Sequence, residues 1–573
     1  MTDKISETKK CICGSSFDIT GKDKVFYDMV SPIFNGIKYQ IPSPNICPDC
    51  RQQRRLAFRM ERNLYRRKCD FTGKSLISMY SPDKKDIVYD YDIWWSDKWS
   101  AFDHGTDFDF SRPFFEQFHE LFMKVPKAHI EISPSENSEY TNQAGYNKNC
   151  YLIFEAGYCE DSMYSNSIWN SKDTMDSSFV NYADNCYECL DVKRSFALFY
   201  SQECENCSDS SYLTDCQNCQ NCLGCWNLRG KQYHILNKPV SKESYEKTIC
   251  DIKKDPEKKR DFLKILYNEK KDGVIGRDLH NIGSENAIGN NISESNDCSG
   301  FDIQGSRNCT DSYSIYDSVD CKDYSYWGNK SSLIYESTSI GNIANKILFS
   351  WMCYENINDI IYSMNCVNGS SYLFGCVGMK NSSYCILNKQ YTREEYEILV
   401  PKIIEHMKTI GEWGEFFPAN LSPFGYNETV AMEYYPISSS DSINRIATDG
   451  KPIFNWSDYE NPIVKVEKTI PADKLPDDII DIPDDIVNWA ILCEISGKPF
   501  RIMKKELDFY RKHSLPISRR HPDIRHMDRM SMRNLRKIYD SVCFKCSTEI
   551  RTTYAPEENK IVYCQQCYDK EVY

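Results

Sequence analysis

The chain has 573 residues, a net charge of −13 and a hydrophobic fraction of 41%, which is ordinary for a folded protein in water. This length predicts several domains, roughly three or four at about 100–200 residues each. No apolar run approaches the ~18–20 residues that span a bilayer, and the first ten residues lack the apolar core of a signal peptide. We therefore expect a cytoplasmic protein with no membrane partner. Its 28 cysteines are then metal ligands or buried thiols rather than disulfides.

One segment near the N-terminus returns near the C-terminus. Pro48–Tyr89 aligns without a gap with Pro522–Tyr563 at an offset of 474, and 13 of 42 positions are identical. Four of the identities are arginines, and the others include one cysteine and a shared Ile-Val-Tyr ending. Since a repeat within one chain is evidence about architecture, we expect homologous modules at the two ends.

Both ends also carry paired cysteines at spacings typical of zinc sites. Two close thiol pairs separated by a loop supply the four soft ligands of a tetrahedral zinc ion. The N-terminal set is Cys11, Cys13, Cys47 and Cys50, and the C-terminal set is Cys543, Cys546, Cys564 and Cys567. The sequence therefore predicts two structural zinc ions as cofactors, one in each module.

The alignment shows that the two copies keep different metal sites. The positions of the C-terminal cysteines are occupied in the first copy by Cys69, Thr72, Asp90 and Ile93. Conversely, Cys47 and Cys50 become His521 and Ile524 in the second copy. We infer that an ancestral module with two metals has been reduced to one metal in each copy.

A basic helix is predicted over about residues 48–68, with an arginine face opposite an apolar face. The candidate nucleic-acid-binding residues are Arg51, Arg54, Arg55, Arg59, Arg62 and Arg66, with Arg525, Arg529, Arg533 and Arg536 in the second copy. Guanidinium rows suit the phosphates of nucleic acid or a nucleoprotein. The alternatives are a solvated face or pairing with the chain's own acidic residues between Asp90 and Asp109.

Residues 89–126 are aromatic and acidic and include Trp94, Trp95 and Trp99. A platform for stacking bases uses such side chains, but aromatic residues more often pack a core or a domain interface. A short helix is predicted over Glu116–Val125, after Pro113.

From about residue 140 to 390, short polar segments alternate with regularly spaced cysteine and tyrosine, such as Tyr313, Tyr324 and Tyr335 at intervals of 11. This repeating pattern predicts a β-solenoid in which equivalent side chains of successive repeats stack on one another. A longer duplication relates Gly224 to Gly375 and Tyr233 to Tyr384 at an offset of 151. Each half should end in a capping helix, opened by Ser241 or by Thr392.

Cysteines are dense in the first solenoid half. Cys216, Cys219, Cys222 and Cys225 follow one another at intervals of three. They are a candidate for an additional metal or iron–sulfur site, although they match no defined ligand spacing. The alternative is a set of buried ladder residues, because free thiols behave as small hydrophobes.

The expected fold is multidomain and mainly β, with central β-solenoid-like repeats between two homologous α+β zinc modules. The predicted segments are an N-terminal zinc module (1–88), an aromatic connector (89–139), two solenoid halves with helices (140–275 and 276–410), a proline-rich connector (411–485) and a C-terminal zinc module (486–573). A short helix is also expected at Ile486–Leu492.

The terminal modules resemble zinc-ribbon and treble-clef modules, and the whole arrangement resembles a group of uncharacterised bacterial zinc-ribbon proteins. The resemblance covers about 150 residues at the two ends. It implies no catalytic residues.

Three functions remain open. The leading hypothesis is a zinc protein that binds nucleic acid or a nucleoprotein through its arginine helices. An alternative is a solenoid scaffold that assembles protein partners, and a further one is a carbohydrate-active enzyme. The nine histidines form no evident triad or two-His-one-carboxylate set. An enzyme is therefore the least favoured of the three, and we assign no catalytic residue.

Overall fold

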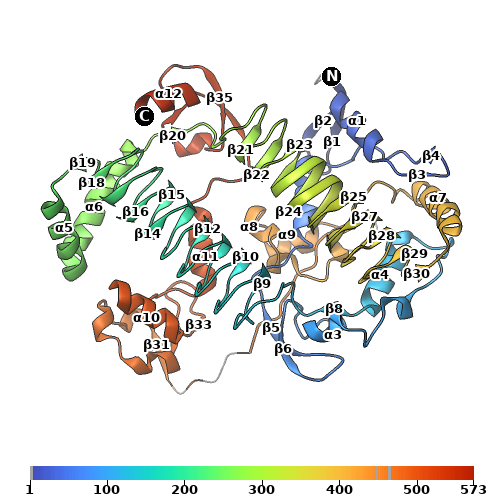
Figure 1. The fold of residues 1–573 in the computed structure, drawn as a ribbon, viewed down its shortest axis with the longest axis horizontal. Helices are drawn as coiled ribbons and strands as arrows, with labels where there is room; N and C mark the ends of the chain where they lie inside the picture. Colours follow the sequence, from blue (N-terminus) through green and yellow to red (C-terminus); the bar gives the residue numbers. More distant parts are fainter. Residues whose placement is uncertain (1–3, 447–449, 451, 463–465, 467) are drawn as a thin grey trace. The chain divides into compact units, whose positions relative to one another are not determined.

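The computed structural model describes residues 4–446, 450, 452–462, 466 and 468–573. The chain forms two compact units (Figure 1). Unit 1 contains Met1–His129 and Leu279–Tyr459, whereas unit 2 contains Ile130–Asp278 and Glu460–Tyr573. Each unit therefore combines one end of the chain with one half of the central region, and the N-terminal module shares a unit with the second half.

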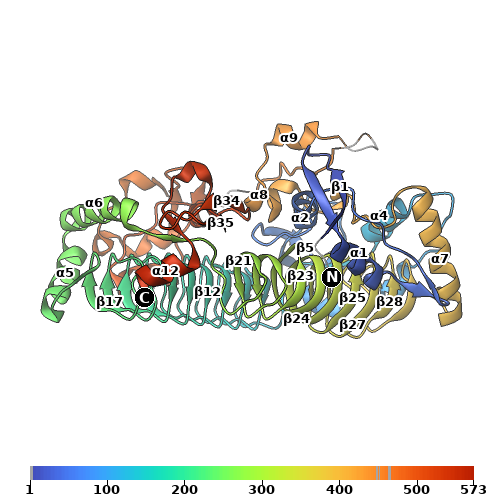
Figure 2. The same cartoon turned by 90° about the horizontal axis from the view of Figure 1, so that it is seen from above.

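Unit 2 contains a stack of short parallel strands, which we call the first strand stack (residues 142–239; Figure 2). One of its sheets contains β9 (Asn142–Gly145), β10 (Phe154–Gly157), β11 (Asn166–Trp169), β12 (Ser178–Asn181), β13 (Leu190–Lys193) and β15 (Gln202–Glu205). The other contains β14 (Phe196–Phe199), β16 (Ser208–Ser211), β17 (Gln220–Leu223), β18 (Gln232–Ile235) and the antiparallel β19 (Lys238–Pro239). Phe154 pairs with Asn142 below and Asn166 above, so each repeat, or rung, has 12 residues.

Within a rung the backbone has a period of three. Every third residue has a positive φ, as at Tyr146 (58°), Asn149 (55°) and Leu152 (50°). The residues that directly follow these corners, such as Cys150 and Ile153, are buried inside the stack. Cysteine and serine side chains line this interior together with alanine, valine, isoleucine and leucine. This explains why cysteines recur at multiples of three in the sequence.

Interior hydroxyl groups link neighbouring rungs. The Ser165 hydroxyl donates to the Met163 carbonyl (2.9 Å) and accepts from the Ser177 N–H (3.1 Å) one rung later. Ser177 repeats the pattern with the N–H of Cys189 (3.1 Å). Because the corners leave these amides without a backbone carbonyl, the hydroxyls satisfy them inside the stack.

Unit 1 contains the second strand stack (residues 288–390). Its strands are β21 (Ile288–Ser293), β22 (Ser299–Gln304), β23 (Arg307–Thr310), β24 (Ser312–Gly341), β25 (Ala344–Leu348), β26 (Trp351–Tyr354), β27 (Ile357–Ile361), β28 (Ser371–Phe374), β29 (Ser383–Ile386) and the antiparallel β30 (Lys389–Gln390). Interior hydrogen bonds span 11, 12 or 13 residues, so rung length varies in this stack.

Helices follow both stacks, as the sequence predicts. The first stack leads into α5 (Lys242–Lys254) and α6 (Pro256–Gly273), and the second into α7 (Arg393–Thr409). Ser241 and Thr392 are the N-caps of α5 and α7, and the predicted capping box at Thr392 is confirmed. Tyr245 and Tyr396 pack their rings against the last rungs, so both helices cover an end of a stack.

The remaining elements build the modules. Those of unit 1 are β1 (Ile5–Lys10), β2 (Ser16–Thr20), α1 (Gly21–Val30), β3 (Ile33–Phe34), β4 (Ile37–Lys38), α2 (Pro48–Leu56), β5 (Tyr65–Lys68), β6 (Ser75–Ser78), β7 (Val88–Tyr89), α3 (Tyr91–Trp95), α4 (Phe114–Lys124), β8 (Lys127–Ala128), α8 (Ala431–Tyr434) and α9 (Ser439–Asn444). Those of unit 2 are β20 (Gly276–Arg277), β31 (Thr469–Pro471), β32 (Ala490–Leu492), β33 (Pro499–Phe500), α10 (Lys504–His513), α11 (Pro522–Ser531), β34 (Tyr539–Val542), β35 (Glu549–Thr552), β36 (Val562–Tyr563) and α12 (Gln565–Val572).

Two predicted helices differ from the structure. The basic helix ends at Leu56 instead of about residue 68, because Phe58 and Arg59 donate to carbonyls only three residues back and close a turn. Tyr65–Lys68 then pairs with β6 as a strand. The helix expected at Ile486–Leu492 is a 3₁₀ turn over Asp484–Asn488 followed by β32. The helix after Pro113 is confirmed as α4.

Candidate metal centres and arginine docking sites

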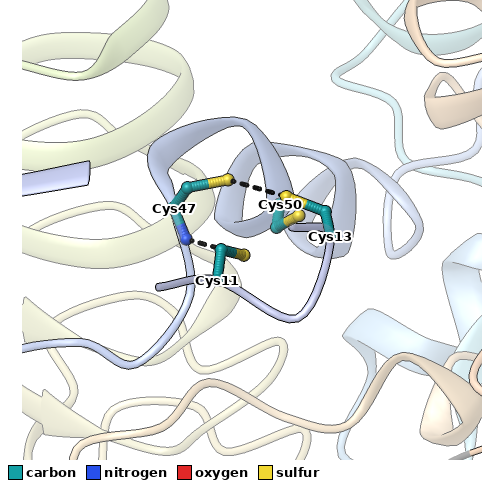
Figure 3. Close-up of side chains that lie close together, drawn as sticks. All are labelled: Cys11, Cys13, Cys47 and Cys50. Carbon is teal, nitrogen blue, oxygen red and sulfur yellow. Dashed lines mark hydrogen bonds between the residues drawn. The ribbon is translucent and has the colours of Figure 1, made fainter. Parts of the chain in front are cut away.

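The N-terminal cysteines meet at the start of α2 (Figure 3). Cys11 and Cys13 lie on the tight turn between β1 and β2, and Cys47 is the N-cap of α2. The four sulfur atoms all lie within 4.8 Å of one another. The Cys47 N–H donates to the Cys11 Sγ (3.2 Å), as expected where a helix N-terminus faces a thiolate. The hydrogen bond from Cys50 lowers the pKa of Cys47 to about 5.

The C-terminal cysteines form the same arrangement at the start of α12. Cys543 and Cys546 lie on the turn between β34 and β35, and Cys564 is the N-cap of α12. These sulfur atoms with that of Cys567 again lie within 4.8 Å of one another. One cysteine is exposed in each set, Cys13 and Cys546, but Cys564 is half-buried where Cys47 is buried, so this site is the more open of the two. The donor set of four thiols fits zinc in both clusters.

Each unit also contains a second turn of the same type that has a single cysteine. Cys69 lies between β5 and β6, and its Sγ accepts from the N–H groups of Thr72 (3.4 Å) and Asp90 (3.2 Å). Cys493 lies between β32 and β33, and its Sγ accepts from the Ser496 N–H (3.5 Å). These turns keep the hydrogen bonds of the four-cysteine sites without the other three sulfur atoms.

The cysteines of the first strand stack form no such group. In the described part of the chain, only the two terminal sets bring three or more ligand atoms within 4.8 Å of one another. Cys216 and Cys219 donate instead to backbone carbonyls, including those of Cys225 (3.6 Å) and Leu228 (3.5 Å). The metal site considered for Cys216, Cys219, Cys222 and Cys225 therefore finds no support, and these side chains lie buried in the interior columns.

In unit 1, the arginines of α2 are buried against acidic residues of the second strand stack. Arg51 lies 2.9 Å from Asp323 and 3.6 Å from Glu336. Arg55 contacts the same two carboxylates at 3.3 and 2.9 Å, and its Nε donates to the Ser325 hydroxyl (3.4 Å). All four charged side chains are buried. Charges taken this far from water are tolerated because they are paired.

In unit 2, α11 docks on the first strand stack in the same way. Arg525 lies 2.5 Å from Asp176, and Arg529 lies 3.3 Å from Asp176 and 3.9 Å from Glu188. The Nε of Arg529 donates to the Ser178 hydroxyl (3.4 Å), just as Arg55 donates to Ser325. Burial raises the pKa of Glu188 to about 7, against the opposing effect of Arg529.

The third arginine of each row stacks on an aromatic ring. Arg59 lies 3.9 Å from the ring centre of Tyr326, and Arg533 lies 3.7 Å from that of Phe179. Arg533 also pairs with Asp191 at 3.2 Å. The same docking geometry is therefore repeated by two independent pairs of segments.

The remaining predicted arginines have varied environments. Arg54 pairs with Glu336 (3.4 Å) and Glu415 (3.0 Å). Arg536 is buried, Arg62 is half-buried and Arg66 is exposed on β5.

The sequence left intramolecular pairing of the arginines as an alternative. The contacts of Arg51 and Arg55, and of Arg525 and Arg529, which we call the central arginines, favour this alternative. The partners are not the acidic residues between Asp90 and Asp109 but carboxylates of the strand stacks. Sequence reasoning missed Asp176 and Glu188, and their counterparts Asp323 and Glu336. An alignment of the two stacks by rung contains the signal, because both copies place Asp and then Glu in the same column.

The aromatic segment packs inside unit 1. Phe114, Phe118 and Phe122 of α4 are buried in a core with Trp351 and Phe417. This matches the interpretation of these residues as a core or interface, and not as an open platform for bases. Trp94, Trp95 and Trp99 gather around Lys380, with its Nζ between 4.7 and 5.9 Å from the three ring centres.

No protein family model and no curated protein matches the chain. Among solved structures, a provisionally assigned acetyltransferase from Desulfovibrio desulfuricans G20 aligns at 7% identity and a TM-score of 0.11. The alignment covers 42% of this chain and 65% of the other, and a likeness this weak carries no functional argument. Among the described residues, no helix is both long and apolar enough to cross a membrane.

Proposed function

We propose that this chain is a zinc-stabilised scaffold protein. Two structural zinc ions, held by the terminal four-cysteine clusters, fix the modules that dock onto the two strand stacks. We interpret the stacks as β-solenoids, whose outer faces are available to protein partners. The observation that carries the proposal is the repeated burial of Arg51 and Arg55, and of Arg525 and Arg529, against carboxylates of the same chain.

That pairing weakens the competing nucleic-acid hypothesis. A phosphate backbone is bound by cationic groups that water and counterions reach. The central arginines of both rows are buried and already face carboxylates. The net charge of −13 also opposes binding to a polyanion. Binding of nucleic acid then depends on other groups of the surface.

The state of the cysteines supports a reducing compartment. None of the 28 cysteines, all of which the structure describes, forms a disulfide, and this includes Cys204 and Cys207, whose side chains lie within hydrogen-bonding distance of each other. Proteins of oxidising compartments use such pairs as disulfides. A cytoplasmic location is therefore part of the proposal.

The outer face of the first strand stack offers a specific surface for a partner. Tyr146 and Tyr158 lie in one column with parallel rings whose centres are 4.9 Å apart. They are 55% and 58% exposed, and Tyr182, two rungs beyond Tyr158, is 61% exposed. Exposed tyrosines in a row provide a large contact area at low entropic cost, which suits a protein interface.

Affinity purification of the zinc-loaded full-length chain tests the proposal. We expect a protein partner in stoichiometric amount after treatment with DNase and RNase. The triple substitution Tyr146→Ser, Tyr158→Ser and Tyr182→Ser should reduce its recovery at least tenfold, because interface tyrosines are frequent hot spots. Tyr267→Ser on α6, where the tyrosine is 73% exposed, is the matched control.

A mixed pool of RNA and DNA provides the opposing measurement. Loss of the partner on nuclease treatment, with salt-dependent binding of the pool by the purified chain, would support nucleic acid as the ligand and contradict the scaffold. Equal partner recovery with the triple variant would place the interface on another surface.

A further inference from the structure

A second contact holds each terminal module on its strand stack. In unit 1, Lys380 of the stack lies over the rings of Trp94 (4.7 Å) and Trp99 (4.8 Å), and its Nζ donates to the Trp94 carbonyl. In unit 2, Arg229 of the stack lies over the rings of Tyr568 (5.8 Å) and Tyr573 (5.1 Å). A cation over the face of an aromatic ring is attracted by the ring quadrupole.

These two contacts occupy equivalent positions in both repeats of the sequence. Trp94 corresponds to Tyr568 and Trp99 to Tyr573 at the module offset of 474. Lys380 corresponds to Arg229 at the stack offset of 151. Two separate alignments therefore lead to one contact, which we call the cation–aromatic latch.

The chemistry around the latch differs between the units. In unit 2 it is polar. The Tyr568 hydroxyl donates to Asp215 and accepts from Arg229 Nη2 (2.7 Å), and the Tyr573 hydroxyl donates to Gln217 (2.9 Å). Asp215 and Gln217 lie one rung before Arg229 in the stack. Arg229 also pairs with Asp215 at 2.8 Å.

In unit 1 the same positions are apolar. The rung before Lys380 carries Val367 where the first stack carries Gln217, and Asn365 where it carries Asp215. Val367 is buried with Trp94 and Ala128. Indole rings have no acceptor for an incoming donor. Their N–H groups are used elsewhere, since Trp94 donates to the Pro126 carbonyl (3.0 Å).

The chain therefore contains two homologous modules and two homologous stacks, and both arginine rows contact an Asp, a Glu and a Ser of the stack. They differ in added contacts, since Arg525 also pairs with Glu506 of α10 (3.3 Å) and Arg51 lies 3.7 Å from Asp311. The contacts to the stack that the rows share do not distinguish the two pairings.

The residues of the cation–aromatic latch do differ between the two units. Tryptophan in place of Tyr568 would remove the hydroxyl that donates to the buried Asp215, which then keeps Arg229 and Asn227 as side-chain partners. A tyrosine hydroxyl in place of Trp94 would face Val367. Such mismatches give specificity by penalising the wrong pairing. The contact of Tyr573, which is 74% exposed, contributes less.

We propose that the latch residues are the specificity determinants that assign each zinc module to its own strand stack. The determinants are Tyr568 and Tyr573 with Asp215, Gln217 and Arg229 in unit 2, and Trp94 and Trp99 with Asn365, Val367 and Lys380 in unit 1. This inference rests on the docking of modules in the proposed function, but it does not depend on any outside partner.

The test uses the full-length zinc-loaded chain and hydrogen exchange of α12 (Gln565–Val572). Tyr568→Trp with Tyr573→Trp converts the module side of unit 2 to the type of unit 1. We expect amide protection in α12 to fall about tenfold, the scale of one lost hydrogen bond to a buried carboxylate. Adding Asp215→Asn, Gln217→Val and Arg229→Lys converts the stack side as well and should restore protection.

Restored protection in the variant with all five substitutions would distinguish matched specificity determinants from residues that only fill space. If the five substitutions together lower protection further than the two tryptophans alone, the positions are not matched determinants and the proposal fails. Tyr568→Phe with Tyr573→Phe is a second variant that keeps the ring shape. It should also lower protection, and unchanged exchange in it contradicts the role of the hydroxyls. Partner recovery is a separate readout, so failure of the scaffold proposal leaves this result interpretable.

Discussion

Unit 1 and unit 2 contain homologous elements, but the four-cysteine cluster lies at the start of a different helix in each unit. In unit 1 the four-cysteine cluster lies at the start of α2, which carries Arg51 and Arg55. In unit 2 the cluster lies at the start of α12, which carries the latch residue Tyr568. The arginine helix α11 and the latch helix α3 have His521 and Asp90 as N-caps, and the N–H groups of these two residues donate to the single cysteines Cys493 and Cys69. Docking onto the stack is thus the shared feature, and metal supports a different contact in each unit.

Loss of each metal site should therefore loosen a different helix. Cys47→Ser with Cys50→Ser should lower zinc from two ions to one per chain and remove hydrogen-exchange protection from α2. Cys564→Ser with Cys567→Ser should also leave one zinc ion, but it should release α12 while α11 stays protected. A structural zinc ion contributes up to ~10 kcal/mol to a small domain. This makes it the largest effect expected here.

Elemental analysis and site-resolved hydrogen exchange provide the two measurements. Cys250→Ser, which changes an exposed cysteine of α5, is the control and should leave both zinc ions in place. Equal loosening of both units by either pair of substitutions would show that the metal sites are not separate.

The arginine rows should contribute equally in the two units if docking is their shared role. Arg55→Met and Arg529→Met each remove one cation from a buried ion cluster, in which Arg51 remains beside Asp323 and Arg525 beside Asp176. Breaking a buried ion pair typically costs ~3–5 kcal/mol. We expect a similar decrease in the free energy of unfolding for both variants in urea denaturation. Lys68→Met changes an exposed cation of β5 and should shift stability by less than ~0.5 kcal/mol. A loss confined to one of the two variants would break the equivalence of the rows.

The sequence predicted the metal clusters and the capping helices more accurately than the contacts between the modules and the stacks. The paired cysteines and the offset of 474 were enough to predict both metal clusters, since ligand spacing is local. The capping helices were also predictable, because Ser241 and Thr392 signal them directly. The partners of the arginines were not, because Asp323 and Asp176 come close to α2 and α11 only through long-range docking. Acidic residues that recur in a polar repeat are also typical of a solvent-exposed face. The sequence alone therefore does not show that a helix covers them.

Restoring the missing ligands gives the last comparison between the units. Thr72→Cys, Asp90→Cys and Ile93→Cys would complete a four-cysteine set with Cys69, and the corresponding changes at Ser496, His521 and Ile524 would complete one with Cys493. Both turns keep the hydrogen bonds of a metal-binding turn, with Gly73 and Gly497 N–H groups 2.9 Å from the Cys69 and Cys493 carbonyls. We therefore expect each variant to bind three zinc ions in place of two by elemental analysis. The stability gain should be small, because Asp90 and His521 are N-caps whose replacement costs ~1 kcal/mol.

Adding Cys69→Ser or Cys493→Ser should abolish the third ion. Zinc that stays at two with all four cysteines present would mean that these turns have lost more than their ligands.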